Sequence, residues 1–528
     1  MKAMEPTDSE TTPPKRGFKF PGAVTTLVIV TLLVWVAVLF IPAGLYRTDV
    51  DGSPIPGTFE LIASPLSPGE RFEQLILAPV NGVYGLRSSE TERVGTEIVG
   101  RIFGQIGVIV FIMSIGAFIS VSFATRSLEV AVASLAHRLR DKGWLLITSV
   151  MVLFSLLGST MGFSVETLGF YALFLPLMAA LGYDRLVTAS MIILGALIGV
   201  MASTVNPFSI GVAAGEAGVS IGDGIVLRVV LWVVLTAMSI GWVLRYAAKV
   251  RTDPKASLVG WDEPADAASA VGEDATAKAG QPETTVQLST MQKWVLVITA
   301  TAFGLMIFSV IPWSSVLGGR SAPADYYGTH EVIGAQPLWF ELNWWFPELS
   351  MLFILASVLV GAVARMGEKE TVRLIAAGAA DMLGPAMVVL LAGGVSAIMN
   401  NTQTMDTILH SVEQLVSDAS AGVFTMLTVL LNVPLAMLIP SSSGHGALVM
   451  PLLAPLADFA EVSRATTITA WIMGHGLALM LSPTSVVLVG GLAIAKVGYD
   501  KYLRFVWPLL LALFVVSTAI ISLATTLG

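Results

Sequence analysis

Eleven long apolar stretches constrain the fold of this chain more than any other feature. A helix needs about 20 apolar residues to cross the roughly 30 Å hydrocarbon layer of a bilayer, and several of the stretches reach that length. Only 12% of the 528 residues are charged, whereas soluble domains carry about 25%. We therefore predict an all-α integral membrane protein that is solvated by lipid. The stretches lie at 22–44, 102–124, 144–181, 186–215, 225–248, 294–313, 347–366, 382–401, 423–460, 466–495 and 503–527.

Composition narrows the class of function. The chain has no cysteine, which excludes a disulfide, a thiolate nucleophile and a cysteine metal site. The formal net charge is −8, and the basic residues stand at the ends of apolar stretches, so we expect no nucleic-acid partner. The first stretch is longer than the apolar core of a cleaved signal peptide and follows Lys15, Arg16 and Lys19. It predicts an uncleaved first span of a multi-pass protein in a bacterial-type inner (cell) membrane.

The second half of the chain repeats the first half at a spacing of 279 residues. The segment 164–203 falls on 443–482 without a gap, and the same shift places 107–124 on 386–403. Duplicated halves are common in transporters, and we predict a true internal repeat. Matches among Ser, Pro, Arg and Gly carry the most weight: Ser164 with Ser443, Pro176 with Pro455, Arg185 with Arg464, Gly195 with Gly474 and Ser203 with Ser482.

Charge predicts that the two repeats have opposite orientations. Clusters of Lys and Arg follow three of the stretches and precede the last one, and such clusters favour the cytoplasmic side. The segment 403–422 has acids but no Lys or Arg, although the repeat shift aligns it with the basic segment 124–143. Equivalent segments then lie on opposite sides of the membrane. This requires that 144–181 and 423–460 each enter and leave from one side.

We therefore predict inverted repeats with about nine transmembrane helices and two re-entrant hairpins, a cytoplasmic N-terminus and an external C-terminus. The domain boundaries follow from the composition. They are a disordered cytoplasmic segment 1–20, a first repeat 21–250 with hairpin 144–181, a cytoplasmic linker 251–290, and a region 291–528 that holds a linking helix and the second repeat with hairpin 423–460.

Four short polar motifs interrupt otherwise apolar segments, and the repeat matches them in two pairs. GSTMGFSVET (158–167) and PSSSGHGAL (440–448) form the predicted hairpin tips, while ASTVNPF (202–208) and LSPTSVV (481–487) break the partner helices. Pro207 and Pro483 remove backbone donors, and the carbonyls they free cannot face lipid. Half-helix N-termini suit an anion, and freed carbonyls with Ser, Thr and Asn oxygens suit sodium. The motifs thus predict an anion pocket flanked by two cation niches.

The motifs supply the candidate site residues. We expect substrate-binding roles for Thr160, Glu166, Asn206, Ser442, Ser443, His445, Thr484 and Ser485. We expect sodium-binding roles for Ser159, Ser203, Thr204, Asn206, Ser441, Ser482 and Thr484, and no other metal.

Two ionisable residues stand at equivalent positions of the tips. Glu166 and His445 are related by the repeat shift, and an ionisable residue inside a membrane is a functional hypothesis by default. Glu166 suits a cation, a substrate amine or a proton, with a structural helix cap as the alternative. His445 suits a carboxylate or a proton relay, with a hydrogen bond to backbone as the alternative. His475 lies within an apolar segment and is interpreted as packing or interhelical bonding.

Three strings identify a resemblance to a known family. NPFSIGVAAGEAGV (206–219), IPSSSGHGALVMPLLAPLAD (439–458) and LSPTSVVLVGGLAIAKVGYDKYL (481–503) resemble the YfcC-like branch of the DcuC family in the ion transporter superfamily. The namesakes of the family are four-carbon dicarboxylate anaerobic carriers, and the branch is described as basic amino acid antiporters. The similarity runs from about residue 100 to the C-terminus. Similar sequences usually carry two adjacent acids in the first hairpin, whereas here Val165 precedes Glu166.

The resemblance implies a homodimer in which each protomer has a scaffold domain and a mobile transport domain. It also implies that substrate and sodium lie between the hairpin tips and the broken helices. Transport would occur by an elevator-like displacement. Relatives in the superfamily include dicarboxylate/sodium symporters and aminobenzoyl-glutamate transporters, and the latter resemble the predicted nine crossings with two hairpins.

Together these features predict a secondary active transporter of a small organic anion (dicarboxylate-like) or amino acid, sodium-coupled and elevator-type. It would have no catalytic residue and no cofactor beyond sodium ions. The alternative is a proton-coupled or exchange-type basic amino acid antiporter, with Glu166 or His445 as proton carrier. A channel shares such midplane motifs but cannot concentrate its substrate. An intramembrane enzyme is the last alternative: the His-Glu-x-x-His run is absent, and Ser443 near His445 gives only a faint Ser/His dyad.

Labelling of single cysteines tests the inverted orientation. Because the chain has no native cysteine, one cysteine near residue 130 and another near residue 410 can be probed separately with an impermeant maleimide. We expect the two positions to react from opposite sides of the membrane. Reaction of both from the same side would contradict inversion.

Overall fold

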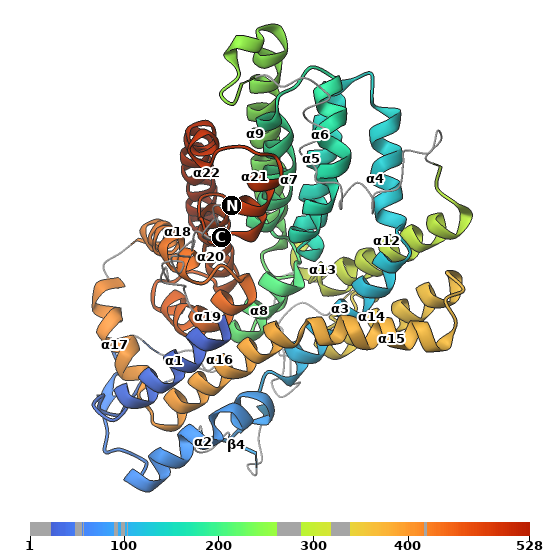
Figure 1. The fold of residues 1–528 in the computed structure, drawn as a ribbon. Coiled ribbons are helices and arrows are strands. Elements are labelled where there is room, and N and C mark those ends of the chain that lie inside the picture. Colours follow the sequence, from blue (N-terminus) through green and yellow to red (C-terminus); the bar gives the residue numbers. More distant parts are fainter. Residues whose placement is uncertain are drawn as a thin grey trace, which may run out of the picture.

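The computed structural model describes residues 23–47, 55, 57–88, 93–96, 101–102, 104–260, 287–317, 338–416 and 420–527, and it is mostly helical (Figure 1). The α-helices are α1 (Ala23–Ala37), α2 (Pro68–Tyr84), α3 (Ile106–Ala124), α4 (Ser127–Arg138), α5 (Gly143–Met161), α6 (Tyr171–Ala180), α7 (Arg185–Met201), α8 (Val212–Ala217), α9 (Ile225–Thr252), α12 (Thr290–Val310), α13 (Trp313–Val316), α14 (Phe346–Val363), α15 (Glu368–Asp381), α16 (Leu383–Asn401), α17 (Met405–Val416), α18 (Ala421–Leu438), α19 (Ser442–Phe459), α20 (Arg464–Leu479), α21 (Val486–Ile494) and α22 (Tyr499–Leu527). Three short helices of other pitch are η1 (Val165–Phe170), η2 (Pro207–Gly211) and η3 (Pro254–Ala256).

The described residues also form five short β-strands, which the prediction of an all-α protein did not include. β1 (Gly44–Leu45) pairs with β2 (Glu60–Leu61), and β3 (Leu86–Arg87) pairs with β4 (Val94–Gly95) and β5 (Arg101–Ile102), all antiparallel. They lie in the loop region around α2. Asn401 at the end of α16 fixes this region, because its side chain accepts a hydrogen bond from the Val94 amide at 2.6 Å and donates to the Val94 carbonyl at 2.8 Å.

Helix boundaries recur with the spacing found in the sequence. α3 and α16, α5 and α18, and α7 and α20 begin at positions whose separation lies within two residues of 279. The caps repeat as well. Asp184 caps α7 by accepting a hydrogen bond from the Val187 amide at 2.8 Å, and Ser463, its equivalent, caps α20 by accepting from the Thr466 amide at 3.2 Å. Such caps satisfy orphan donors of the first turn, so both repeats start these helices in the same way.

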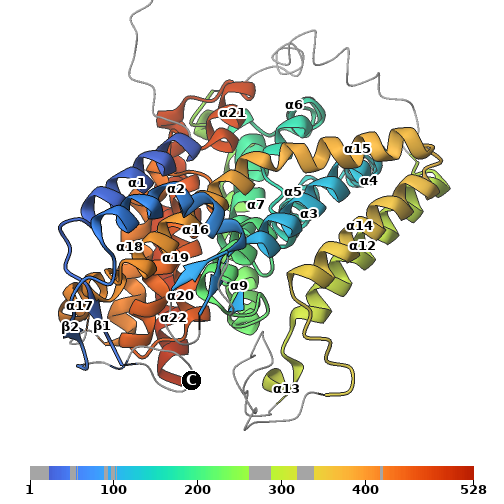
Figure 2. The same ribbon diagram turned by 90° about the horizontal axis from the view of Figure 1, so that it is seen from below.

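The helices form two groups, which Figures 1 and 2 show from two directions. The first group, here called the crossing layer, consists of α1, α2, α3, α12, α14, α15 and α16, in which α3 packs on α14 and α15, and α16 packs on α1 and α2. The second group, here called the bundle, consists of α5 to α9 and α18 to α22. In the bundle α5 packs on α7, α18 on α20, and α9 on α22. The groups meet where α16 contacts α19 and α3 contacts η2.

Glycines allow the closest approach inside the bundle. A Cβ added at Gly199 of α7 would lie 2.2 Å from the carbonyl oxygen of Ser155 in α5, and one added at Gly158 would lie 2.6 Å from the Ala196 carbonyl oxygen. Lipid supplies no hydrophobic drive between apolar helices, so close packing at small residues holds them together. α7 and α20 approach in the same way, because a Cβ at Gly476 would meet the Met201 side chain at 2.3 Å.

Eight of the described helices are long and apolar enough to cross a membrane: α3, α5, α9, α12, α14, α16, α18 and α22. Six of them coincide with predicted crossings, which supports a multi-pass membrane protein. The other two, α5 and α18, are the first arms of the predicted hairpins. The count differs from nine because the length criterion includes these arms and omits α1, α7 and α20, which have 15, 17 and 16 residues.

Two parts of the predicted domain scheme are outside the described residues. These are the N-terminal segment 1–20 and positions 261–286 of the linker 251–290. At the edges of that linker, α9 continues to Thr252 and α12 begins at Thr290.

A matched pair of glycine substitutions tests the packing of α5 on α7. We expect Gly199→Ala to destabilise the protein by about 1–3 kcal/mol, because the new methyl group overlaps backbone. Gly304→Ala in α12 is the control, since no atom lies within 4 Å of its added Cβ and helix propensity favours Ala over Gly by up to about 1 kcal/mol. Thermal unfolding of the purified variants in detergent measures the stability of each. Equal unfolding midpoints for Gly199→Ala and Gly304→Ala would contradict the close packing of α5 on α7.

Candidate functional site

Each of the four polar motifs lies where a helix of the bundle is interrupted. α5 ends at Met161 before η1, and α7 ends at Met201 before η2. In the second repeat, α18 ends at Leu438 before α19, and α20 ends at Leu479 before α21. We call the first interruption of each repeat its tip and the second its break, so that tip 1 is 162–164, break 1 is 202–206, tip 2 is 439–441 and break 2 is 480–485.

Hydrogen bonds join tip 1 to break 1. The Ser159 hydroxyl, in the last turn of α5, donates to the Ala202 carbonyl at 2.9 Å and to the Thr204 hydroxyl at 3.1 Å. The Thr204 amide donates to both the hydroxyl and the carbonyl of Ser159 at 3.0 Å. Both side chains are buried. A backbone group freed by the break therefore finds its partner in the neighbouring helix, as a low-dielectric surrounding requires.

Asn206 organises the end of break 1. Its side-chain oxygen accepts a hydrogen bond from the Phe208 amide at 3.0 Å, and its amide nitrogen donates to the Ser203 hydroxyl at 3.2 Å. Asn206 thereby caps the half-helix that starts with Pro207, a position where proline costs no hydrogen bond. Gly162 of tip 1 lies directly against it: an added Cβ would be 3.0 Å from the Asn206 side-chain oxygen, and its φ of +71° favours glycine.

Break 2 has the same design with different residues. The Thr484 hydroxyl donates to the Met437 carbonyl at 2.9 Å, near the end of α18, and pairs with the Ser482 hydroxyl at 2.7 Å. Ser485, the equivalent of Asn206, caps α21 by accepting from the Leu488 amide at 3.4 Å. The Ser441 hydroxyl of tip 2 accepts from the Gly444 amide at 3.4 Å and pairs with the Ser443 hydroxyl at 3.1 Å. In both repeats a break is bonded to the helix that precedes the tip, α5 in the first repeat and α18 in the second.

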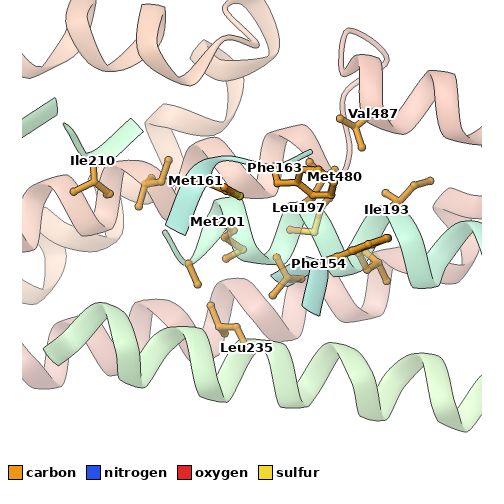
Figure 3. Close-up of a cluster of buried hydrophobic side chains, with 14 of the residues drawn as sticks. Phe154, Met161, Phe163, Ile193, Leu197, Met201, Ile210, Leu235, Met480 and Val487 are labelled. Carbon is orange, nitrogen blue, oxygen red and sulfur yellow. The ribbon is translucent and has the colours of Figure 1, made fainter. Parts of the chain in front are cut away.

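The two repeats also pack on each other at these places. η1 of the first repeat contacts α21 of the second, while α19 of the second contacts η2 and α8 of the first. Figure 3 shows buried apolar side chains of this junction, and the labelled ones come from α5, tip 1, α7, η2, α9, break 2 and α21. Those in or beside tip 1, break 1 and break 2 are Met161, Phe163, Met201, Ile210, Met480 and Val487. Tip 1 and the two breaks thus border one buried cluster to which both halves contribute.

Glu166 and His445 lie in different environments, although the sequence predicted equivalent polar tips. The side chain of Glu166 is exposed and accepts a hydrogen bond from the Ser164 amide at 3.1 Å, whereas its repeat equivalent His445 is fully buried. Thr160 donates to the Leu156 carbonyl of its own helix at 2.8 Å. The sequence treated Glu166 and His445 as one kind of residue because the repeat shift relates positions and not environments. Ser442 is partly buried at the first turn of α19.

A histidine pair is the feature that sequence reasoning did not assemble. His445 Nδ1 of α19 lies 2.9 Å from His475 Nδ1 of α20, and both rings are fully buried. The Trp471 ring packs against both, with ring centroids 5.7 Å from His445 and 5.9 Å from His475. Interhelical bonding was one of two interpretations of His475, but its partner is 30 positions away and no pattern in the sequence connects them.

The faint serine–histidine dyad is not formed. The Ser443 hydroxyl pairs with Ser441, and His445 Nδ1 pairs with His475, so neither atom is engaged as a nucleophile–base pair would require.

Glu216 was also missed. It is a partly buried acid of α8 whose carboxylate accepts a hydrogen bond from Gln105 at 3.3 Å, while its other oxygen has no partner among the described residues. An acid directly after the apolar stretch 186–215 was the available signal. In the part of the chain that the structure describes, no group of three or more His, Asp or Glu side chains could hold a metal ion.

Comparison with known proteins identifies the family. The model of the family described as DcuC, C4-dicarboxylate anaerobic carrier, matches residues 20–526. The chain belongs to this family. Its relatives are transporters and carriers, and it is a membrane transporter rather than an enzyme.

Curated relatives match over nearly the whole chain. The Escherichia coli (strain K12) protein named "Putative basic amino acid antiporter YfcC" is 26% identical and is aligned over 98% of each chain. An uncharacterized protein of Haemophilus influenzae is 26% identical, with 97% of this chain and 98% of that protein covered. The citrate transporter of Bacillus subtilis is 26% identical over 30% of this chain and 36% of its own length. The resemblance to the YfcC-like branch is therefore confirmed.

Two solved transporters share the fold. The YdaH transporter of Alcanivorax borkumensis superposes with a TM-score of 0.62 and 14% identity, covering 95% of this chain and 98% of that chain. MtrF of Neisseria gonorrhoeae, described as one of a class of antimetabolite efflux pumps, superposes with a TM-score of 0.63 and 14% identity, covering 96% of this chain and 95% of that chain. At this identity the likeness concerns the fold alone.

Removal of one hydroxyl tests the link between tip 1 and break 1. We expect Ser159→Ala to destabilise the protein by about 1 kcal/mol more than Ser239→Ala, because the net value of a buried hydrogen bond is of that order. Ser239 is an equally buried control whose hydroxyl bonds only to the Leu235 carbonyl of its own helix. Thermal unfolding in detergent gives the comparison. A smaller effect at Ser159 would contradict the link.

Proposed function

We propose that this protein is a secondary active transporter of a small organic anion (dicarboxylate-like) or an amino acid, and that its substrate binds where the tips and breaks of both repeats meet. One observation carries the proposal: each repeat bonds its break to its hairpin arm, and the breaks and tips of the two repeats pack on each other. Interrupted segments in matching halves are the usual signature of a transporter binding site.

The chemistry of the breaks supports an anionic group on the substrate. Half-helix N-termini begin at η2, α19 and α21, after Asn206, Ser441 and Ser485. Amide groups at a helix N-terminus attract a carboxylate. The caps hold these turns in place by hydrogen bonds, so the remaining amides need no rearrangement to receive a ligand. Ser443, buried one turn from the Ser441 cap, adds a hydroxyl to this end of α19.

Names of relatives support two substrate classes. The family is described as carriers of C4-dicarboxylates, and YfcC is named for basic amino acids. Both classes carry a carboxylate and fit the helix termini. Glu166 is exposed at tip 1, where it suits the second amine of a basic amino acid better than a dicarboxylate, since like charges repel.

Coupling by sodium is the first candidate. Ser159, Ser203 and Thr204 gather uncharged oxygens at break 1, and Ser482 and Thr484 do so at break 2. Sodium prefers such oxygen ligands, as other hard cations do. Proton coupling or exchange is the second candidate, and the buried His445–His475 pair is the observation that favours it.

The two helix groups support an elevator-like mechanism. The bundle contains all tips and breaks and would be the transport domain, while the crossing layer would be the scaffold and dimer-forming part. The protein would work as a homodimer in the inner membrane, with a cytoplasmic N-terminus and an external C-terminus.

Uptake into proteoliposomes tests the class of function. Purified protein is reconstituted, and labelled C4-dicarboxylates and basic amino acids are offered under an imposed sodium gradient, an imposed proton gradient, or neither. A coupled transporter concentrates one of them above equilibrium, whereas a channel only equilibrates it. Absence of any accumulation, with every candidate and gradient, would contradict the proposal.

Two alanine variants test the site. We expect Asn206→Ala and Ser443→Ala to reduce uptake by about tenfold or more at low substrate concentration, because a hydrogen bond to a charged group is worth about 1.5–3 kcal/mol. Ser463→Ala is the matched control: it removes a helix cap of the same kind at the start of α20, away from the tips and breaks. Uptake is measured per folded protein. If Asn206→Ala and Ser443→Ala take up substrate as well as Ser463→Ala does, Asn206 and Ser443 do not belong to the substrate site.

A further inference from the structure

The histidine pair has an arrangement that a purely structural contact does not need. His445 and His475 meet through their Nδ1 atoms, 2.9 Å apart, and both Nε2 atoms are buried without a hydrogen-bond partner among the described residues. Buried polar atoms are normally satisfied. Trp471, which packs against both rings, also leaves its indole nitrogen without a partner. Three buried nitrogen atoms on three rings in mutual contact therefore have no hydrogen-bond partner among the described residues.

The contact between the two Nδ1 atoms dictates the protonation states. A hydrogen bond needs one donor and one acceptor, and a neutral imidazole carries one proton on either Nδ1 or Nε2. One ring must therefore carry its proton on Nδ1, which leaves its Nε2 bare. The other ring must accept at Nδ1, so that its proton is on Nε2. The neutral pair thus presents a base at one end and an acid at the other.

We propose that His445 and His475 together form the proton-carrying site of this transporter. A proton enters by forming an N–H bond at the bare Nε2, which gives a cation with both Nε2 atoms protonated and one proton shared between the two Nδ1 atoms. Loss of a proton from the opposite Nε2 breaks one N–H bond and restores a neutral pair with reversed tautomers. One proton enters and one leaves, and the two ends of the pair are the entrance and the exit.

The surroundings suit a charge that exists only for part of the cycle. The Trp471 ring lies within the roughly 6 Å at which a cation is attracted to an aromatic face. Two of the nearby charges pair with each other, because Arg464 of α20 lies 2.6 Å from Asp458 of α19, and one oxygen of Glu216 on α8 accepts from Gln105. Among the elements packed on α19 and α20, α16, α18 and η2 carry no ionisable residue. The others carry Arg185 on α7, Glu216 on α8, Asp406, His410 and Glu413 on α17, and Tyr499, Asp500, Lys501, Tyr502 and Arg504 on α22.

The position of the pair connects it to the proposed substrate site, and the inference rests on that proposed function. His445 follows Ser443 by two residues in the first turns of α19. His475 precedes Gly476, whose added Cβ would touch Met201 at the start of break 1. A change of charge at the pair would thus be felt at tip 2 and at break 1 together, which is what coupling of proton and substrate requires.

Nitrogen NMR tests the arrangement without any substrate. The chain has five histidines, so a sample labelled with ¹⁵N-histidine gives an assignable spectrum. We expect one neutral ring protonated on Nδ1 and one protonated on Nε2, both lost together in His445→Gln and in His475→Gln. His410→Gln, which alters the histidine that contacts Tyr46 at 3.0 Å, is the control and keeps both signals. Two rings protonated on Nε2 in the wild type would overturn the proposal.

Transport assays test the role. In proteoliposomes we expect each Gln variant of the pair to lose proton-driven accumulation by about tenfold or more. In His475→Gln, substrate exchange at equal pH on both sides should stay within about threefold of the wild type. His410→Gln should keep both activities. Accumulation at the wild-type level in either folded variant of the pair would overturn the proposal.

If the variants do not fold, the wild type alone still tests the inference. Substrate uptake should change the internal pH of liposomes that contain a trapped pH dye, because protons move with or against the substrate. Substrate uptake without any change of internal pH would overturn the inference. Such a result, with uptake intact, would leave the proposed transporter function standing. A wild type that carries no candidate under any gradient would instead contradict the proposed function.

Discussion

Every other feature of this structure depends on how the backbone is satisfied at the interruptions of the bundle helices. In a hydrocarbon surrounding, an unpaired amide or carbonyl costs several kcal/mol, so a helix can be broken only where another segment supplies partners. Ser159 does this for break 1 by bonding to Ala202 and Thr204, and Thr484 does it for break 2 by reaching the Met437 carbonyl. The helix before the tip and the broken helix of each repeat are therefore one unit, which explains why the glycines that bring them together are so tightly packed.

The two repeats share this framework but differ in what they place on it. Asn206 and Ser485 occupy equivalent positions and both cap a half-helix, so this position is determined by the backbone. Glu166 and His445 are equivalent as well, yet one is exposed and the other fully buried. Once duplication provides two breaks of similar geometry, the side chains that the backbone does not need are free to diverge. The buried histidines, His445 and His475, then belong to the second half alone.

The sequence predicted what depends on local chemistry and on the repeat. Pro207 and Pro483 with their Ser and Thr neighbours located both breaks, because removal of a backbone donor is a local property. The lengths of the helices in these stretches were left open by the sequence: α5 and α18 run for 19 and 18 residues, within the half-to-full-depth range that the hairpin interpretation allowed. His475 was assigned to packing or bonding without a partner, because its contact with His445 depends on how α19 meets α20. Glu216 carried a readable signal, an acid directly after an apolar stretch, and its partner Gln105 again comes from a distant segment, just before α3.

The two candidate coupling chemistries differ in what they demand of the protein. At break 1 the hydroxyls of Ser159, Ser203 and Thr204 already bond to one another or to backbone, so a sodium ion would have to replace bonds that hold the break together. Its binding would then be strongest where the tip has moved away from the break. The histidine pair needs no such change, because its free nitrogens are outside its own hydrogen bond. With both features, the protein would bind a proton at the histidine pair while break 1 stays closed, whereas break 1 would have to open before a sodium ion binds there. The order of these events would set which ion drives transport.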